Sequence, residues 1–121
     1  MARRENTSGT PYGTLELLIL AALRVKPLHG YAIARQIEQL SGERILVEEG
    51  SLYPALQRLL KRGSVTASWE TQPNGREVRQ YTITAQGRKT HAEEVARWEE
   101  IARGIQCVIR DEEGRLRARL A

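Results

Sequence analysis

Apolar residues of this chain recur at helical spacing in four segments and alternate with polar residues in a fifth. The first helical segment, residues 14–27, is apolar around nearly its whole circumference; Thr14 is suited to cap it and Pro27 to end it. A helix of this kind is covered on both sides. We therefore expect Leu17 and Leu20, on the side away from the main apolar face, to pack against another subunit.

A second, amphipathic helix is predicted over residues 29–42. Its apolar stripe runs from Ile33 to Leu40 at helical spacing, and Gly42 is a typical C-terminal stop. His29 precedes the helix, where a capping or packing role is expected. A connector with a short apolar centre follows.

Residues 51–62 are predicted to form the third helix, with the leucines at 52, 56 and 59 turned inward. Ser51 can cap this helix, and Pro54 then falls within the first turn, where a missing backbone donor costs nothing. Gly63 closes it. The residues that point away from the leucine stripe are Pro54, Gln57, Arg58 and Lys61, with Tyr53 on a flank.

The alternating segment predicts a β-hairpin. Val65, Ala67 and Trp69 alternate with polar residues, and the pattern resumes after a Pro-Asn-Gly turn, a strong hairpin signal because Asn and Gly tolerate positive φ. The tip and second arm carry Arg76 and Arg79, so the hairpin has a basic end.

The last helix is predicted over residues 85–110. Its apolar residues recur at alternating steps of four and three, which is the 3.5-residue period of a helix that pairs with another helix. Its seam consists of His91, Val95, Trp98, Ala102, Ile105 and Ile109. We expect this helix to form a homodimer interface.

Composition allows one small domain. The 121 residues carry a net charge of +4, which favours an acidic partner such as nucleic acid only weakly. The single cysteine, Cys107, excludes an internal disulfide and suits a reducing cytoplasm. No apolar run is long enough to span a bilayer, and the first residues lack the apolar core of a secretory signal. The predicted organisation is a flexible arm (1–12), a DNA-binding domain (13–84), a dimerisation helix (85–110) and a tail (111–121).

The predicted fold is mainly α with a small β-hairpin: a winged helix-turn-helix followed by a long C-terminal dimerisation helix. Its third helix has the width of the DNA major groove, and its glutamine and arginine can pair with adenine and guanine. The candidate DNA-binding residues are Ser51, Tyr53, Pro54, Gln57, Arg58, Lys61, Arg62, Arg76 and Arg79. The alternative, a solvated basic face, is common for such helices, but the basic hairpin beside this one favours DNA.

Catalytic and metal chemistry find no support in the sequence. The two histidines are far apart and have no cysteines at metal spacing, and the glycines form no phosphate-binding loop. No pairing of a nucleophile with a base is apparent. We therefore expect neither enzymatic activity nor a cofactor, and a packed thiol rather than a redox switch at Cys107.

Four stretches, "GTLELLILAAL", "HGYAIARQI", "GSLYPALQRLLKRG" and "REVRQYTITAQGRK", resemble successive signatures of the PadR family of bacterial transcriptional regulators. The resemblance spans about residues 13–110 and is closest to the short, acidobacterial-type members. It implies a cytoplasmic homodimeric repressor whose last and first helices form the interface and whose Tyr53 contacts the operator. The stretch "ERILVEE", residues 43–49, departs from this picture, because it places two acids just before the third helix. These acids would repel nearby DNA phosphates unless they cap the helix or turn away.

The sequence thus predicts a regulator that binds operator DNA as a homodimer, with release by a small ligand. In some short members of the resembled family, an aromatic residue of the last helix lines a pore that binds flat apolar compounds, which makes Trp98 a candidate for binding a planar aromatic effector. The rival hypothesis is a winged-helix module that binds protein rather than DNA.

Overall fold

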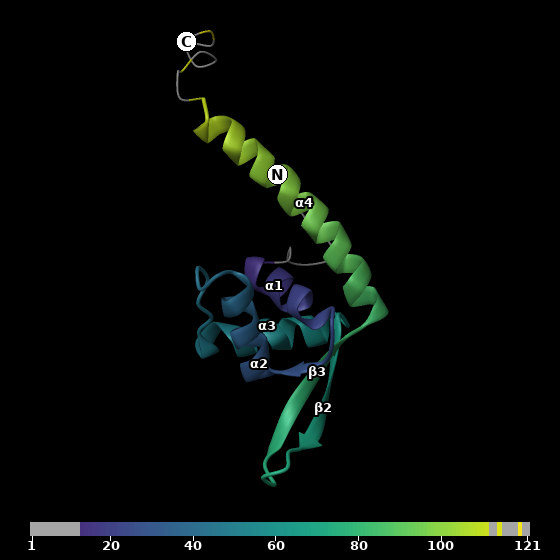
Figure 1. The fold of residues 1–121 in the computed structure, drawn as a ribbon. Helices are drawn as coiled ribbons and strands as arrows, with labels where there is room; N and C mark the ends of the chain where they lie inside the picture. Colours follow the sequence, from purple (N-terminus) through teal and green to yellow (C-terminus); the bar gives the residue numbers. More distant parts are fainter. Residues whose placement is uncertain (1–12, 112–113, 115–118, 120–121) are drawn as a thin grey trace.

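The computed structural model describes residues 13–111, 114 and 119. The expected N-terminal arm and most of the expected tail lie outside these residues. Figure 1 shows a small body of helices, a hairpin that extends from it and a long helix that leaves it in another direction. The elements in chain order are α1 (Thr14–Leu23), β1 (Leu28–His29), α2 (Gly30–Leu40), α3 (Glu49–Lys61), β2 (Val65–Thr71), β3 (Glu77–Ile83) and α4 (Ala85–Ile109).

One apolar core joins the first three helices to the base of the hairpin. The buried leucines of α3 lie in one cluster with Ile19 and Leu23 of α1 and the two buried isoleucines of α2, because residues three and four apart share a helix face. Val65 and Ile83, which pair across β2 and β3, close the core from the strand side. This packing fixes α3 and the hairpin relative to each other.

The sheet has three antiparallel strands in the order β1-β3-β2. The β2–β3 hairpin is the predicted one, and Gly75 at its tip takes the positive φ of 87° that the turn requires. Strand β1 was not predicted, because it comprises two residues that pair with Tyr81 and Gln80 of β3. Such a short strand forms through a distant partner and leaves no alternation in the sequence.

Helix α4 begins as predicted at the Thr84 cap, whose hydroxyl accepts a hydrogen bond from the backbone nitrogen of Gly87 at 2.9 Å. The Thr84 backbone nitrogen also donates to the Ser64 carbonyl. Gly87 packs so closely on this carbonyl that a Cβ would lie 2.1 Å from its oxygen. Beyond these first turns α4 leaves the body (Figure 1).

Several sequence-based expectations were wrong at the helix ends. Helix α1 starts after Gly13, so Thr14 lies inside the helix rather than capping it. Helix α3 starts at Glu49, so Ser51 is not its cap, and Pro54 is its sixth residue rather than part of the first turn. At that position, the Gly50 carbonyl loses the helical hydrogen bond that proline cannot donate.

Three side chains also face a different side than predicted. Leu20, expected at a subunit interface, is fully buried in the core of its own chain. His91, expected on the seam of α4, is likewise buried within the chain. Leu40, expected in the α2 stripe, is 71% exposed because it lies at the last turn of α2, beyond the reach of the core.

The fold is the predicted winged helix-turn-helix with a long C-terminal helix. Among the described residues, no helix is both long and apolar enough to cross a membrane.

Candidate nucleic-acid interface

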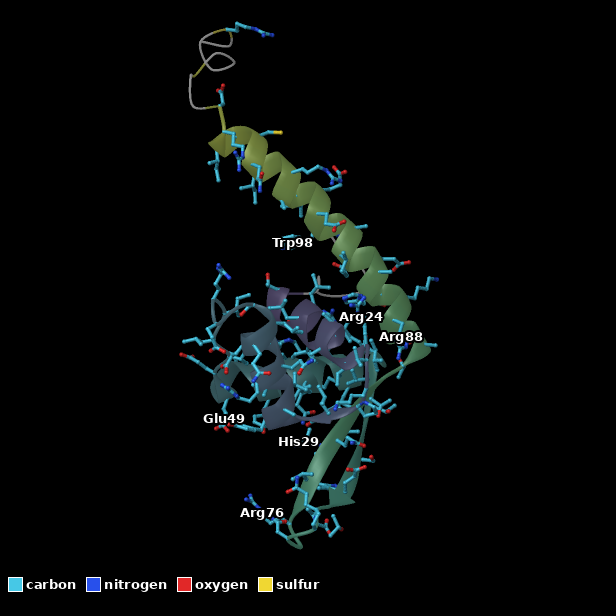
Figure 2. All side chains as sticks on the ribbon, viewed as in Figure 1. Arg24, His29, Glu49, Arg76, Arg88 and Trp98 are labelled. Atoms are coloured by element: carbon cyan, nitrogen blue, oxygen red, sulfur yellow. The ribbon has the colours of Figure 1, made fainter. Side chains whose placement is uncertain are left out.

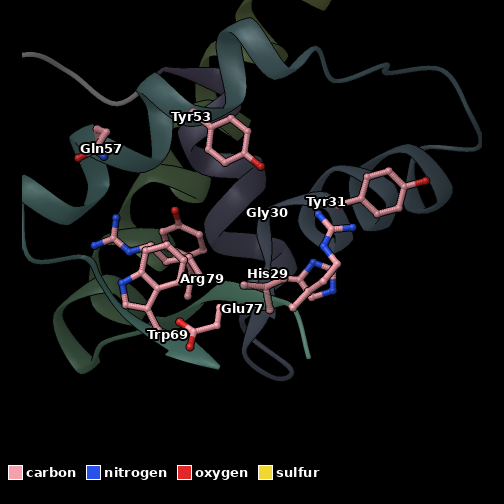
Figure 3. Close-up of a pocket in the computed structure, with 11 residues that line it drawn as sticks. His29, Gly30, Tyr31, Tyr53, Gln57, Trp69, Glu77 and Arg79 are labelled. Carbon is pink, nitrogen blue, oxygen red and sulfur yellow. The ribbon is translucent and has the colours of Figure 1, made fainter. Parts of the chain in front are cut away.

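A cleft of about 440 Å³ lies between α3 and the hairpin, where the start of α2 closes one end. Figure 3 shows Tyr53 and Gln57 of α3 on one side of it and Trp69, Glu77 and Arg79 of the hairpin on the other. Its lining residues are His29, Gly30, Tyr31, Tyr53, Gln57, Trp69, Arg76, Glu77, Val78, Arg79 and Tyr81. Four of the predicted DNA-binding residues, Tyr53, Gln57, Arg76 and Arg79, therefore meet at one surface.

Tyr53 is held in this cleft by a close approach to the first residue of α2. A Cβ on Gly30 would lie 2.9 Å from the Tyr53 hydroxyl oxygen, so glycine at position 30 leaves room for the phenol ring. Tyr53 itself remains exposed. Its hydroxyl can thus both donate and accept a hydrogen bond at the mouth of the cleft.

The hairpin presents its arginines through two different local arrangements. Arg79 pairs with Trp69 across the strands, and its guanidinium carbon lies 5.8 Å from the centre of the indole ring, within cation–π range. This contact holds the Arg79 guanidinium beside the indole, and both residues line the cleft. Arg76 extends at the tip of the hairpin (Figure 2), where its backbone nitrogen donates to the Asn74 side chain at 2.9 Å.

The floor of the cleft carries a buried phenol. Tyr81 is almost fully buried, and burial raises its pKa above the ordinary value, an effect that the nearby Arg79 charge opposes. The Tyr81 hydroxyl therefore stays protonated at neutral pH. Within the described residues, no cluster of three or more His, Cys, Asp or Glu side chains could hold a metal ion.

The remaining predicted residues of α3 lie outside the cleft. Lys61, Pro54 and Ser51 are exposed, and Arg62 follows the last helical residue as the C-cap, where it is half-buried. Lys61 lies one helical turn beyond Gln57, so the two share the outer face of α3. Lys61 can therefore reach a polyanion that lies along this face.

Arg58 is turned toward α1. Its Nε donates a hydrogen bond to Oε2 of Glu16 at 2.7 Å, and the hydrogen bond and the opposite charge raise the pKa of the guanidinium above its usual value. No local sequence pattern predicts this contact, because the two residues are 42 positions apart.

The acids before α3 become the start of the helix. Glu48 is the N-cap residue and Glu49 the first helical residue, both exposed, and a negative charge there interacts favourably with the helix dipole. Just before them, the backbone nitrogen of Val47 donates to Oε2 of Glu38 at 3.0 Å, which ties the connector to α2. The two acids nevertheless reduce the positive potential at this end of α3.

A second surface lies on α4. This face starts with Gly87 and His91, which are buried, and continues through half-buried Val95. It then reaches Trp98, Ile105 and Ile109, which are exposed. Ala102 is half-buried, and exposed Ile101 and Val108 widen the apolar area. Figure 2 shows Trp98 on the part of α4 that has left the body. Leu17 of α1 is half-buried and retains some surface.

The aromatic lining of the cleft was not predicted from the sequence. His29, Tyr31, Trp69 and Tyr81 join it from four different elements, β1, α2, β2 and β3. The hairpin register was the available signal for part of this set, since a symmetric pairing around the turn places Trp69 beside Arg79. His29 and Tyr31 become neighbours of the hairpin only through β1.

Comparisons with known proteins agree on the kind of molecule. A model of the transcriptional regulator PadR-like family matches residues 19–93. A transcriptional regulator from Clostridium thermocellum superposes with a TM-score of 0.69, at 26% identity over 76% of this chain and 86% of that one. Protein X of Lysinibacillus sphaericus is 29% identical over 89 residues, which are 74% of this chain and 82% of the relative.

A further solved structure, Bacillus subtilis PadR in complex with operator DNA, superposes with a TM-score of 0.63 at 27% identity. The superposition covers 70% of this chain and 48% of the Bacillus chain, so this chain spans about half the length of that relative.

Proposed function

This chain belongs to the PadR-like family of transcriptional regulators, and we propose that it is a homodimeric repressor that binds operator DNA and is released by a small ligand. The family and the fold are those of transcriptional regulators, which are not enzymes. We also propose a cytoplasmic location, where operator DNA is found.

The cleft between α3 and the hairpin is the observation that carries the DNA-binding proposal. It combines hydrogen-bonding groups of Tyr53 and Gln57 with the cationic Arg76 and Arg79 on two elements that the core holds in fixed relation. Phosphate contacts require cations and hydroxyl donors, and base contacts require a helix that enters the major groove. The Bacillus relative with the same fold binds operator DNA.

In this proposal α3 lies in the major groove. Gln57 pairs with the N6 and N7 edge of an adenine, and Lys61 contacts a phosphate on the same side of the helix. Tyr53 contacts the backbone at the mouth of the cleft, and the hairpin arginines grip the flanking backbone or minor groove.

The dimer proposal rests on the uncovered apolar face of α4. Trp98, Ile105 and Ile109 are each more than half exposed in the single chain and lie on one line along the helix. A helix with such a face is stable in water when another helix covers it. A second copy is the occupant we propose, because the 3.5-residue period is that of helices that pair side by side.

The ligand proposal concerns Trp98, whose indole can stack with a planar aromatic compound where two copies of α4 meet. Titration of planar aromatic compounds, followed by tryptophan fluorescence, tests it. Trp69 also emits, so the Trp98→Ala variant is the required control. A saturable signal that persists in this variant contradicts a role for Trp98.

DNA binding is tested by fluorescence anisotropy with DNA from upstream of the gene, beside a shuffled duplex, at two salt concentrations. A preference of about a thousandfold is expected for an operator. Lys61→Ala should lower the affinity for both duplexes alike and flatten the salt dependence by about one unit of log–log slope, since one phosphate contact is lost.

The rival function, a winged-helix module that binds protein, uses the same fold with a basic face that contacts no DNA. Weak binding that ignores sequence and disappears at moderate salt would favour it. DNA selected from a random library separates this outcome from an operator that lies elsewhere in the genome.

A further inference from the structure

Glu16 is an exception within α1. It is the one charged residue of this otherwise almost wholly apolar helix, and its side chain is only 6% exposed. A carboxylate that leaves water without a partner is costly, so a buried glutamate is normally paired.

The partner of Glu16 is on the helix proposed to read DNA. Oε2 of Glu16 accepts a hydrogen bond from Nε of Arg58 at 2.7 Å, which makes a charge-assisted contact between α1 and α3. The two residues come together only because α1 and α3 pack on the same core.

The contact with Glu16 uses the Nε of the guanidinium and leaves its two terminal nitrogens available for another partner. Nε is engaged, while within the described residues no bond is found for the two terminal nitrogens, and the Arg58 side chain is 49% exposed. A guanidinium is planar and rigid, so a carboxylate fixed at Nε also fixes the direction of the terminal N–H groups. Those groups form the fork that pairs with O6 and N7 of guanine.

Gly13 also restricts the position of the Glu16 carboxylate. A Cβ there would lie 2.7 Å from Oε1 of Glu16, so the second carboxylate oxygen occupies space that only glycine leaves open. The glutamate is therefore confined by Gly13 on one side and by Arg58 on the other.

We propose that Glu16 is a positioning residue for base recognition: its buried carboxylate holds Arg58 by Nε so that the terminal N–H groups are presented to a guanine of the operator. The inference rests on the proposed function, since it requires that α3 reads DNA. A purely structural role is a weaker explanation, because an apolar pair of similar volume usually packs two helices at least as well as a buried ion pair.

The test is selection of binding sites from random duplexes by the full-length protein, followed by affinity measurements. Wild type is expected to select one guanine per half-site that Arg58→Ala no longer prefers. Glu16→Met removes the acceptor but retains an unbranched side chain for the buried position. It should reduce the preference for this guanine about 10- to 100-fold, as Arg58→Ala does, and should cause no further loss of preference in the Arg58→Ala background.

Two further variants separate the positioning effect from a change of net charge and from misfolding of Glu16→Met. Glu16→Gln keeps an oxygen acceptor and should retain part of the guanine preference. Gly13→Ala displaces the carboxylate without changing net charge and should reduce the same preference. If Glu16→Met does not fold in thermal denaturation, these two variants decide the matter.

The outcomes are distinguishable. If wild type selects no sequence at all, the proposed function fails. If wild type selects a site whose base preferences are unchanged in Arg58→Ala, or if folded Glu16→Met and Gly13→Ala retain the full guanine preference, the positioning role is overturned while DNA binding stands. Equal changes of affinity for selected and shuffled duplexes would also overturn it, because that is the effect of net charge alone.

Discussion

Ile105 offers the sharpest test of the proposed dimer. It lies in the middle of the exposed apolar face of α4 and is 52% exposed in the single chain. A closed two-fold dimer uses the same face twice, so one substitution changes two positions of the interface. We expect Ile105→Asp to convert the dimer to monomers.

The magnitude follows from the exposed fraction. Full burial of an isoleucine side chain contributes about 1.5–3 kcal/mol, so burial of the exposed half contributes about 1 kcal/mol per subunit and about 2 kcal/mol per dimer. Each aspartate adds the cost of an unpaired carboxylate at an apolar interface, on the order of 1 kcal/mol or more even when water reaches part of it. The total of about 4 kcal/mol corresponds to roughly a thousandfold increase in the dimer Kd.

Sedimentation velocity over a hundredfold range of protein concentration measures this shift. The matched control is Ala96→Asp, which adds the same charge at an exposed position on the opposite side of α4. The control should remain dimeric. Operator affinity should fall with Ile105→Asp and be retained by the control, since a dimer holds two recognition helices on one duplex. A persistent Ile105→Asp dimer would refute the assignment of this face.

Two further predictions concern the junction of α4 with the body, and a third concerns the exposed part of α4. Burial and the charge of Arg24 lower the pKa of His91 below its ordinary 6.5, so the folded chain disfavours the protonated imidazole. The contribution of His91 to stability should therefore be full above pH 6.5 and decline as the pH falls below it. In denaturant titrations at several pH values, His91→Gln should flatten this decline. Stability that rises on acidification in this range would contradict the assignment. Gly87→Ala places a Cβ 2.1 Å from the Ser64 carbonyl oxygen and should cost about 1–3 kcal/mol. The helical Gly104→Ala, whose Cβ meets nothing within 4 Å, should instead raise the melting temperature at equal protein concentration.

Local patterns carried most of the fold. The spacing of leucines in α3, the Pro-Asn-Gly turn and the long apolar period of α4 each depend on residues within a few positions of one another. These signals predicted the helices α1 to α4 and the hairpin. They also placed Gln57 and the two hairpin arginines among the candidate DNA-binding residues, and these three residues line one cleft in the structure.

Helix ends were less predictable, because several residues can start a helix at similar cost. The sequence suggested Ser51 as a cap for α3, but the helix begins two residues earlier at Glu49. An acid in the first turn is favoured by the helix dipole, and the bond from Val47 to Glu38 fixes the chain just before it. The second of these causes depends on a contact nine residues apart and has no local signature.

The sequence by itself determined which segments are helical, where the hairpin turns and that α4 carries an apolar face along its length. Only the tertiary structure decided that Leu20 belongs to the core, that His91 is covered by the body and that Arg58 meets Glu16. The reason is physical: periodicity specifies which side of a helix is apolar, but a helix that is apolar all round does not specify its neighbour. A charge pair across 42 residues exists only after the core has brought two helices together.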